Sequence, residues 1–271
     1  MKIRSILRAA STVVLVGSML IAAPKQPQPK SQKEAEAVMA IFNAQDPDAR
    51  IAAADNLLQK YADTEFKAIA LQVAAASAQQ KNDFEKMVIY SERTLEADPN
   101  NYPAMLMLAN GIAQKTRKFD LDKEEKLTKA DKYANSAIEL IAKAEKPRPD
   151  VTDDQWNAAK KDYISQGHEA LAMSAMVREK YDVAVTEFKT AVDGASTPDQ
   201  ATMVRLAAAQ NEANKPDDAI ATIDKINAMP DLNPTVKKYA EQEKVKAMKL
   251  KSGGPPPKPA AAPPQVEVKK P

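Results

Sequence analysis

The feature that most constrains this chain is a pattern that returns about every 35 residues. Ala172 lies 35 residues before Ala207, and Ala184 lies 35 residues before Ala219. In each case a small residue on one helix-periodic segment is followed by a turn and a second such segment. Repetition on this scale is typical of stacked helix pairs, which bury their apolar faces against one another. The pattern predicts an all-α fold, an α-solenoid of antiparallel helix pairs.

The composition agrees with helices. Ala, Lys, Glu, Gln, Leu and Met dominate and are strong helix formers, while the chain has only 6 glycines. Hydrophobic residues make up 44% of the chain, which favours a folded protein over a disordered one. There is no cysteine, and His168 is the single histidine. Disulfides, thiolate chemistry and two-histidine metal sites are therefore excluded.

The net charge of +2 conceals an uneven distribution. Each end of the chain, 1–23 and 251–271, carries +3, which leaves −4 for residues 24–250. A mildly acidic body lacks the basic surface that nucleic-acid binding requires. We therefore expect no nucleic-acid partner.

Residues 1–23 have the composition of a signal peptide. A basic start precedes a largely apolar run of fifteen residues, Ala9 to Ala23, which is shorter than the roughly 20 residues of a spanning helix. We expect an exported protein, periplasmic or secreted, cleaved after Ala22 or Ala23. The alternative is retention in the inner membrane through residues 6–23, which would then be the only membrane contact.

Three further regions follow the N-terminal segment. Residues 24–34 form a Pro/Gln/Lys linker, with folded structure expected from about Gln32, and residues 35–250 are almost entirely helix-periodic. Residues 251–271 are rich in proline and lysine, so we expect a disordered tail. The tail could be a solubilising end, or a ligand for a proline-binding groove or an anionic surface.

Capping residues followed by proline or acidic residues mark helix starts. Capping side chains and first-turn prolines predict starts near Pro47, Pro198 and Pro234. Thr152 to Gln155 and Thr197 to Gln200 have capping-box spacing, which also predicts a start near Asp153.

In the segment 68–101, Ala75 is a small residue on the first helix, Phe84 an aromatic after the turn, and Pro99 a proline at the end of the second helix. With these residues the segment resembles a unit of the tetratricopeptide repeat family, of the exported bacterial type. The unit departs from the family pattern at three positions, which are Met87, Ser91 and Thr94.

Two later units, 165–195 and 200–230, also match the family pattern. The matching residues are Ala172, Tyr181, Ala184, Phe188 and Ala191 in the first, and Ala207, Ala219, Ile223 and Ile226 in the second. The resemblance implies a helical repeat domain over about 35–250.

The rest of that domain is less regular. Residues 102–144 form a unit with an insertion at 115–125, and a second insertion at 146–156 precedes one long helix, expected at Asp153–Val177. Residues 32–62 form an earlier helix pair, and 234–250 a polar capping helix.

The resemblance also implies a binding groove, since in this family the first helix of each pair lines an inner groove. Transferring the register places the following residues there: Gln72, Ala76, Gln79, Leu106, Asn110, Ala113, Glu169, Met173, Met176, Val204, Ala208 and Asn211. Amides, alanine and methionine suit an extended or helical peptide. The alternative is that these residues only pack against neighbouring helices.

No catalytic or metal motif is complete. His168-Glu169 begins like a zinc-protease helix, but Ala172 occupies the position of the second histidine. Asp120, Asp122 and Glu124 alternate like calcium ligands, but Glu125 occupies the position of the necessary glycine. We expect no enzyme activity, no cofactor and no metal.

Trp156 is the only tryptophan. We expect it to pack the inserted segment onto the array, and a contact with a partner is the alternative.

The sequence thus predicts a non-catalytic adaptor or scaffold of the cell envelope that binds a protein or peptide. The alternative is a structural envelope component, whose basic Pro-rich tail attaches to an anionic polymer or membrane surface.

Overall fold

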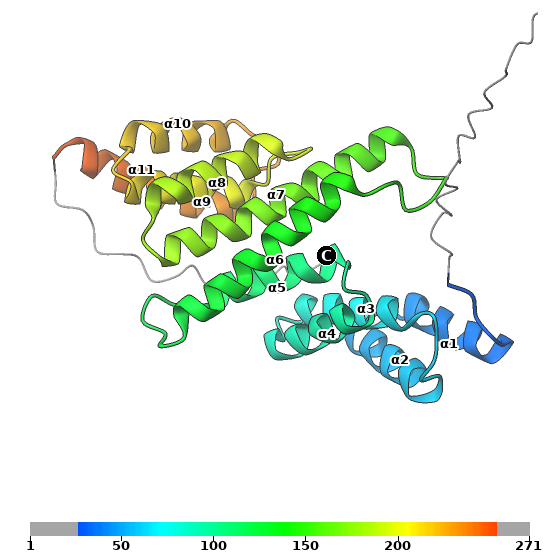
Figure 1. Cartoon of the computed structure of the whole chain (residues 1–271). Coiled ribbons are helices and arrows are strands. Elements are labelled where there is room, and N and C mark those ends of the chain that lie inside the picture. The colour runs from blue at the N-terminus through cyan, green and yellow to red at the C-terminus, as the bar shows by residue number, and fades with distance from the viewer. Residues whose placement is uncertain (1–26, 254–271) are drawn as a thin grey trace, which may run out of the picture.

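The computed structural model describes residues 27–253 and is all-helical over that range (Figure 1). The predicted signal segment 1–23 and the tail beyond residue 253 lie outside the described residues. The helices are α1 (Gln32–Asn43), α2 (Pro47–Lys60), α3 (Lys67–Gln80), α4 (Phe84–Ala97), α5 (Tyr102–Lys115), α6 (Lys123–Lys143), α7 (Asp153–Val177), α8 (Tyr181–Gly194), α9 (Gln200–Glu212), α10 (Pro216–Asn227) and α11 (Pro234–Lys251).

Several helix starts follow the capping signals in the sequence. The carboxylate of Asp46 accepts a hydrogen bond at the start of α2, and Asn233 does the same at α11. Thr152 and Gln155 form a complete capping box at α7, with hydrogen bonds of 3.2 and 3.0 Å. The predicted long helix Asp153–Val177 is confirmed.

The start predicted near Pro198 is two residues too early. Helix α9 begins at Gln200, and Asp199 caps it by accepting a 2.7 Å hydrogen bond from the Thr202 amide. Thr197 and Asp199 are both acceptable caps, and a carboxylate at the positive end of the helix adds a favourable charge interaction.

Three helix pairs share one turn geometry. Asn82, Glu179 and Asn214 follow α3, α7 and α9, and each has a positive φ of 55 to 60°. In each turn the next residue donates its amide to the carbonyl five residues earlier, at 2.8 to 2.9 Å. This is the hydrogen-bond pattern of a Schellman motif. The three turns are therefore built alike, although only one of them has the sequence Asn-Asp-Phe.

Consecutive helices pack against each other along the whole described chain. In addition α1 contacts α3, α3 contacts α5, α5 contacts α7, and α9 contacts α11. Figure 1 shows α1–α4 grouped at one end, α8–α11 at the other, and the long helices α6 and α7 between them.

The small residues expected at helix crossings are buried. Ala75, Ala109, Ala172 and Ala207 on the first helices of the pairs have no exposed surface. The same holds for the alanines expected on the second helices, which are Ala130, Ala134, Ala137, Ala184, Ala191 and Ala219. A methyl side chain allows two helix backbones to approach closely, so these positions set how the helices pack.

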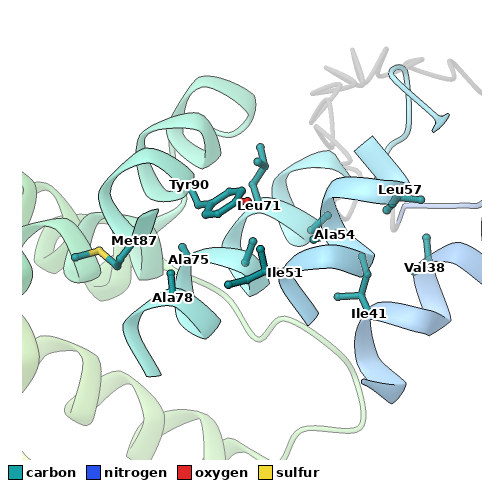
Figure 2. Close-up of a cluster of buried hydrophobic side chains, with 12 residues drawn as sticks. Val38, Ile41, Ile51, Ala54, Leu57, Leu71, Ala75, Ala78, Met87 and Tyr90 are labelled. Atoms are coloured by element: carbon teal, nitrogen blue, oxygen red, sulfur yellow. The ribbon is translucent and has the colours of Figure 1, made fainter. Parts of the chain in front are cut away.

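The apolar interior follows the helix pairs. Figure 2 shows the cluster built by α1–α4, in which Ile41 and Leu57 are fully enclosed and Tyr90 closes one side. A second large cluster, around Phe188 and Ile223, joins α7 to α11. Smaller clusters at α5, α6 and α7 lie between these two.

The two predicted insertions have different surroundings. Residues 116–122 connect α5 to α6, and their loop exposes Phe119 and Leu121. Lys118 of this loop bonds Glu179 at 2.7 Å. The second insertion leads into α7, where Trp156 is buried and Lys160 lies 5.6 Å from its ring centroid. The burial of Trp156 favours the predicted packing role over a contact with a partner.

Candidate binding surface on the first helices of the pairs

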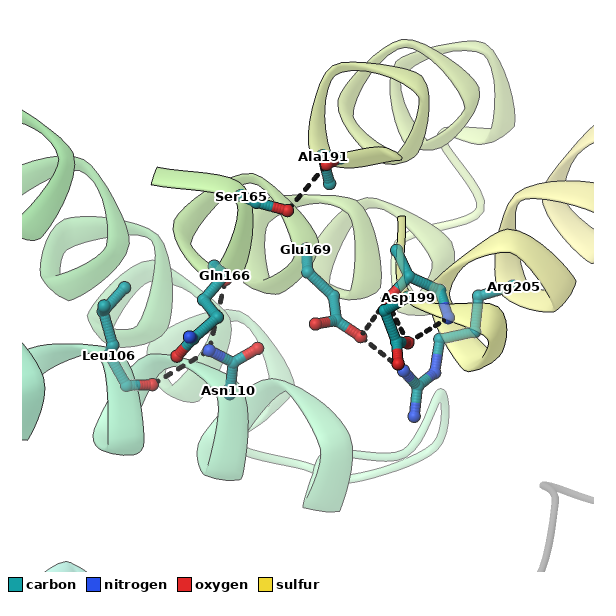
Figure 3. A network of polar contacts seen from close by, with 9 residues as sticks. Leu106, Asn110, Ser165, Gln166, Glu169, Ala191, Asp199 and Arg205 are labelled. Atoms are coloured by element: carbon teal, nitrogen blue, oxygen red, sulfur yellow. Dashed lines mark hydrogen bonds and ion pairs between the residues drawn. The ribbon is translucent and has the colours of Figure 1, made fainter. Parts of the chain in front are cut away.

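The residues predicted to line a groove lie on α3, α5, α7 and α9. Figure 3 shows the central part of this surface, where α5, α7 and α9 exchange polar contacts. The contacts matter because a side chain that already joins two helices is less available to a ligand.

Asn110 joins α5 to α7. Its amide nitrogen lies 3.0 Å from the carbonyl oxygen of Leu106 and 3.2 Å from that of Gln166 (Figure 3). Its side-chain oxygen is not used in these bonds and remains an available acceptor. Gln166 itself is exposed. Asn110 and Gln166 together therefore present amide groups at the crossing of α5 and α7.

Glu169 joins α7 to α9. Arg205 donates from Nη1 to Glu169 Oε1, and the Thr202 hydroxyl lies 3.2 Å from the same oxygen (Figure 3). The Thr202 hydroxyl is also 2.9 Å from Asp199 Oδ2, and its single proton serves one acceptor at a time. Arg205 keeps most of its donors unused and is about one-third exposed.

The electrostatic environment of Glu169 is unfavourable for a carboxylate. Burial raises its pKa above the ordinary value, and nearby Asp199 acts in the same direction. Arg205 and the hydrogen bond from Thr202 act in the opposite direction but do not cancel the effect of burial. The structure therefore holds a paired but poorly solvated acid at the junction of α7 and α9.

Two other predicted residues are used in contacts between helices. The Gln72 side-chain oxygen accepts a 3.0 Å hydrogen bond from Asn101, the residue that caps α5. Asn211 is only 3% exposed and donates to the backbone and carboxylate of Glu243 on α11, at 3.0 and 2.8 Å. These side chains fix neighbouring helices against one another.

The remaining predicted residues divide by exposure. Leu106 is 2% exposed and belongs to an apolar cluster with Ile141. Met173 and Met176 are partly buried against the cluster of α7–α11, and Gln79 is exposed. The accessible side chains at the predicted positions therefore include amides, methionines and the apolar Ala76, Val204 and Ala208. Leu106, Ala113 and Asn211 face the interior.

The prediction omitted Gln166, Thr202 and Arg205, which share this surface. One sequence signal could have identified Arg205: it has the opposite charge to Glu169 and lies 36 residues away, close to one repeat interval. Gln166 carries no comparable signal, because its carbonyl rather than its side chain makes the contact.

The side chains considered for catalysis or metal binding are paired with other groups. His168 Nδ1 lies 2.7 Å from Glu187, and Asp122 lies 2.9 Å from Lys126. Within residues 27–253 no group of three potential ligands is arranged to hold a metal. No helix in the same range is both long and apolar enough to cross a bilayer.

Comparison with protein-family models and with curated proteins finds no match for this chain.

Proposed function

We propose that residues 27–253 form an α-solenoid of the tetratricopeptide type, and that the protein is an exported, non-catalytic adaptor that binds a protein or peptide. Two regularities support the repeat assignment. Three helix pairs share the same turn, and many hydrogen bonds join positions about one repeat apart. Examples are Asp48–Lys81 and Asp162–Ser196, with separations of 33 and 34 residues.

The observation that carries the binding proposal is the chemistry of the surface on α3, α5 and α7. Gln79 and Gln166 are exposed, and Asn110, Met173 and Met176 are partly exposed. Amides can donate and accept hydrogen bonds with a peptide main chain, and thioethers adapt to varied apolar side chains. This combination suits a peptide held mainly through its backbone.

The mechanism requires an ordered surface before the ligand arrives. Contacts such as Asn110 to Gln166 and Arg205 to Glu169 hold the helices in place without a ligand. Association then costs less conformational entropy than it would if the helices ordered on binding.

The test begins with affinity capture from an envelope extract and mass spectrometry, followed by a binding measurement with the recovered partner. Met173→Glu combined with Met176→Glu places two charges on the surface, so we expect at least a tenfold loss of affinity. The control is Met39→Glu with Ile89→Glu, which adds the same two charges at apolar residues elsewhere that are each 54% exposed, and this variant should bind normally.

Folding is checked by circular dichroism and thermal melting. If the methionine pair unfolds the array, Gln79→Glu with Gln166→Glu tests the same surface at exposed positions. Unchanged binding by a folded variant of either pair would eliminate this surface as the site.

A further inference from the structure

The charge of this protein changes sign near its C-terminal end. Residues 24–233 contain 27 basic and 34 acidic side chains, a net charge of −7. Residues 234–271 contain nine lysines and three glutamates, a net charge of +6. Helix α11 alone contributes six of these lysines. Beyond the basic N-terminal segment 1–23, the excess of lysine is therefore confined to the C-terminal end of the chain.

One side of α11 is fully engaged with the rest of the protein. Ala240 and Ala247 are buried against it, and α11 packs on both α9 and α10. Three of its lysines bond acidic residues of those helices: Lys244 bonds Asp224, Lys246 bonds Glu212 and Lys251 bonds Asp217, at 2.5 to 2.7 Å. The helix is thereby fixed in one rotational orientation.

That orientation leaves one outward face, defined here by helical periodicity and exposure. Its members are Lys237, Lys238, Gln242, Val245, Met248 and Lys249, with Ser252 just past the helix end, and all are exposed. Glu241 is also exposed, and its carboxylate accepts a 3.1 Å hydrogen bond from Asn227 on α10. Val245 and Met248 are each 52% exposed and lie at the middle of this face. Among the described residues Lys237, Lys238 and Lys249 make no ion pair, in contrast to the three lysines on the engaged side.

We propose that the outward face of α11 docks on an anionic lipid bilayer. Three lysines would contact lipid headgroups, while Val245 and Met248 enter the interfacial region between them. Lys258, Lys269 and Lys270 follow in the sequence and lie outside the described residues, so only their charge enters the argument. They add to the attraction without requiring fixed positions.

Charge argues against a second copy as the occupant. Pairing two α11 faces would bring Lys237, Lys238 and Lys249 against the same residues of the other copy, and like charges at close range are unfavourable. A bilayer suits the arrangement better than an acidic protein does. It presents a continuous, fluid anionic surface, which accommodates lysines both on a rigid helix and beyond its end.

The experiment is flotation of the full chain with two kinds of vesicle. One contains phosphatidylcholine alone, and the other also contains about 30% of the anionic lipid phosphatidylglycerol. We expect binding only to the anionic vesicles, weakening at least tenfold between low and high salt because exposed charges are screened. Equal binding to both vesicles, or binding to neither, would overturn the proposal.

Charge-reversal variants test whether vesicle binding depends on the outward face of α11 or only on the net charge of the protein. Lys237→Glu, Lys238→Glu and Lys249→Glu together should reduce vesicle affinity at least tenfold. The control changes three exposed lysines elsewhere, Lys67, Lys132 and Lys161, to glutamate with the same change in net charge. An equal loss in the control would show that overall charge, not α11, drives attachment.

Two further variants test the contributions of the apolar side chains of α11 and of the chain beyond residue 253 to vesicle binding. Val245→Ser with Met248→Ser should weaken vesicle binding at least threefold and leave the melting temperature unchanged, because both side chains are exposed. No effect, together with equally tight binding to heparin, would indicate a soluble polyanion instead of a bilayer. Truncation after residue 253 should leave detectable binding, and complete loss would assign attachment to the tail alone.

Discussion

Arg205 on α9 donates a hydrogen bond to Glu169 on α7, and the two residues lie 36 positions apart. The pair links the first helices of two successive helix pairs. The pair also lies on the proposed binding surface. The protonation state of Glu169 therefore affects both the packing of α7 against α9 and the charge that this surface offers to a ligand.

The raised pKa of Glu169 predicts a pH effect on stability. Between the ordinary pKa and the raised one, the folded protein binds a proton that the unfolded chain has released. The free energy of unfolding contributed by this group therefore falls as pH rises through that interval. Glu169→Gln should lack this fall.

The measurement is the urea midpoint of wild type and Glu169→Gln from about pH 4.5 to 7.5. As pH rises, the urea midpoint of wild type should fall relative to the urea midpoint of Glu169→Gln. Glu139→Gln is the control and should follow wild type, because Glu139 is exposed and makes no ion pair within residues 27–253. A constant difference between wild type and Glu169→Gln would contradict the prediction.

Tyr90 predicts a second stability effect. Its hydroxyl donates to Asp55, with oxygen distances of 2.8 and 3.0 Å, and its ring closes the cluster of α1–α4. Tyr90→Phe should lower the free energy of unfolding by about 1–2 kcal/mol, because a hydrogen bond to a charged acceptor is lost. Tyr163→Phe is the control, because the Tyr163 hydroxyl makes no hydrogen bond within residues 27–253. Equal losses of stability in the two variants would contradict the role of the Tyr90 hydrogen bond.

Tyr90 also titrates unusually. Burial, followed by the hydrogen bond to Asp55, raises its pKa to about 12. The folded state keeps a proton that the unfolded chain loses above about pH 10, so stability should fall as pH rises from about 10 to 12. Absorbance titration of the phenolate, with Tyr90→Phe as reference, measures the pKa directly.

A third prediction concerns the loss of stability when a larger side chain replaces the buried Ala172 at a helix crossing. It is fully buried on α7, so Ala172→Leu should destabilise the protein by about 1–3 kcal/mol through overpacking. The matched change Ala76→Leu, at an exposed position of α3, should have little effect on chemical denaturation. Similar denaturation curves for the two variants would mean that the crossing is loosely packed.

The backbone conformation of Glu179 leads us to expect that replacing this residue with glycine stabilises the protein. Its φ of 60° lies in the left-handed region, which is unfavourable for a residue with a long side chain. Glu179→Gly should raise the free energy of unfolding by roughly 0.5–1 kcal/mol, because glycine adopts this conformation without strain. The lost ion pair with Lys118 is exposed and contributes little.

The comparison for Glu179→Gly is Asn82→Gly at the equivalent turn, with stability measured by thermal melting. Asparagine tolerates the left-handed region better than glutamate, so the gain should be smaller there. A larger gain at Asn82 would contradict the argument from backbone strain.

The sequence determined the helices and the small residues between them. Periodicity and capping side chains place α2, α7 and α11 correctly, because these signals act within one turn of helix. The burial of Ala172 and Ala207 was also predictable, since a regular interval between alanines reflects a regular crossing of helices.

Only the tertiary structure decided what the candidate site presents. Gln72 and Asn211 have the right register for a binding surface, yet each bonds a residue 29 or 32 positions away. Sequence fixes which way a side chain points from its own helix. Whether a neighbouring helix then covers that side chain, pairs with it or leaves it to solvent depends on the distance and angle between the helices, which the summed packing of many residues sets.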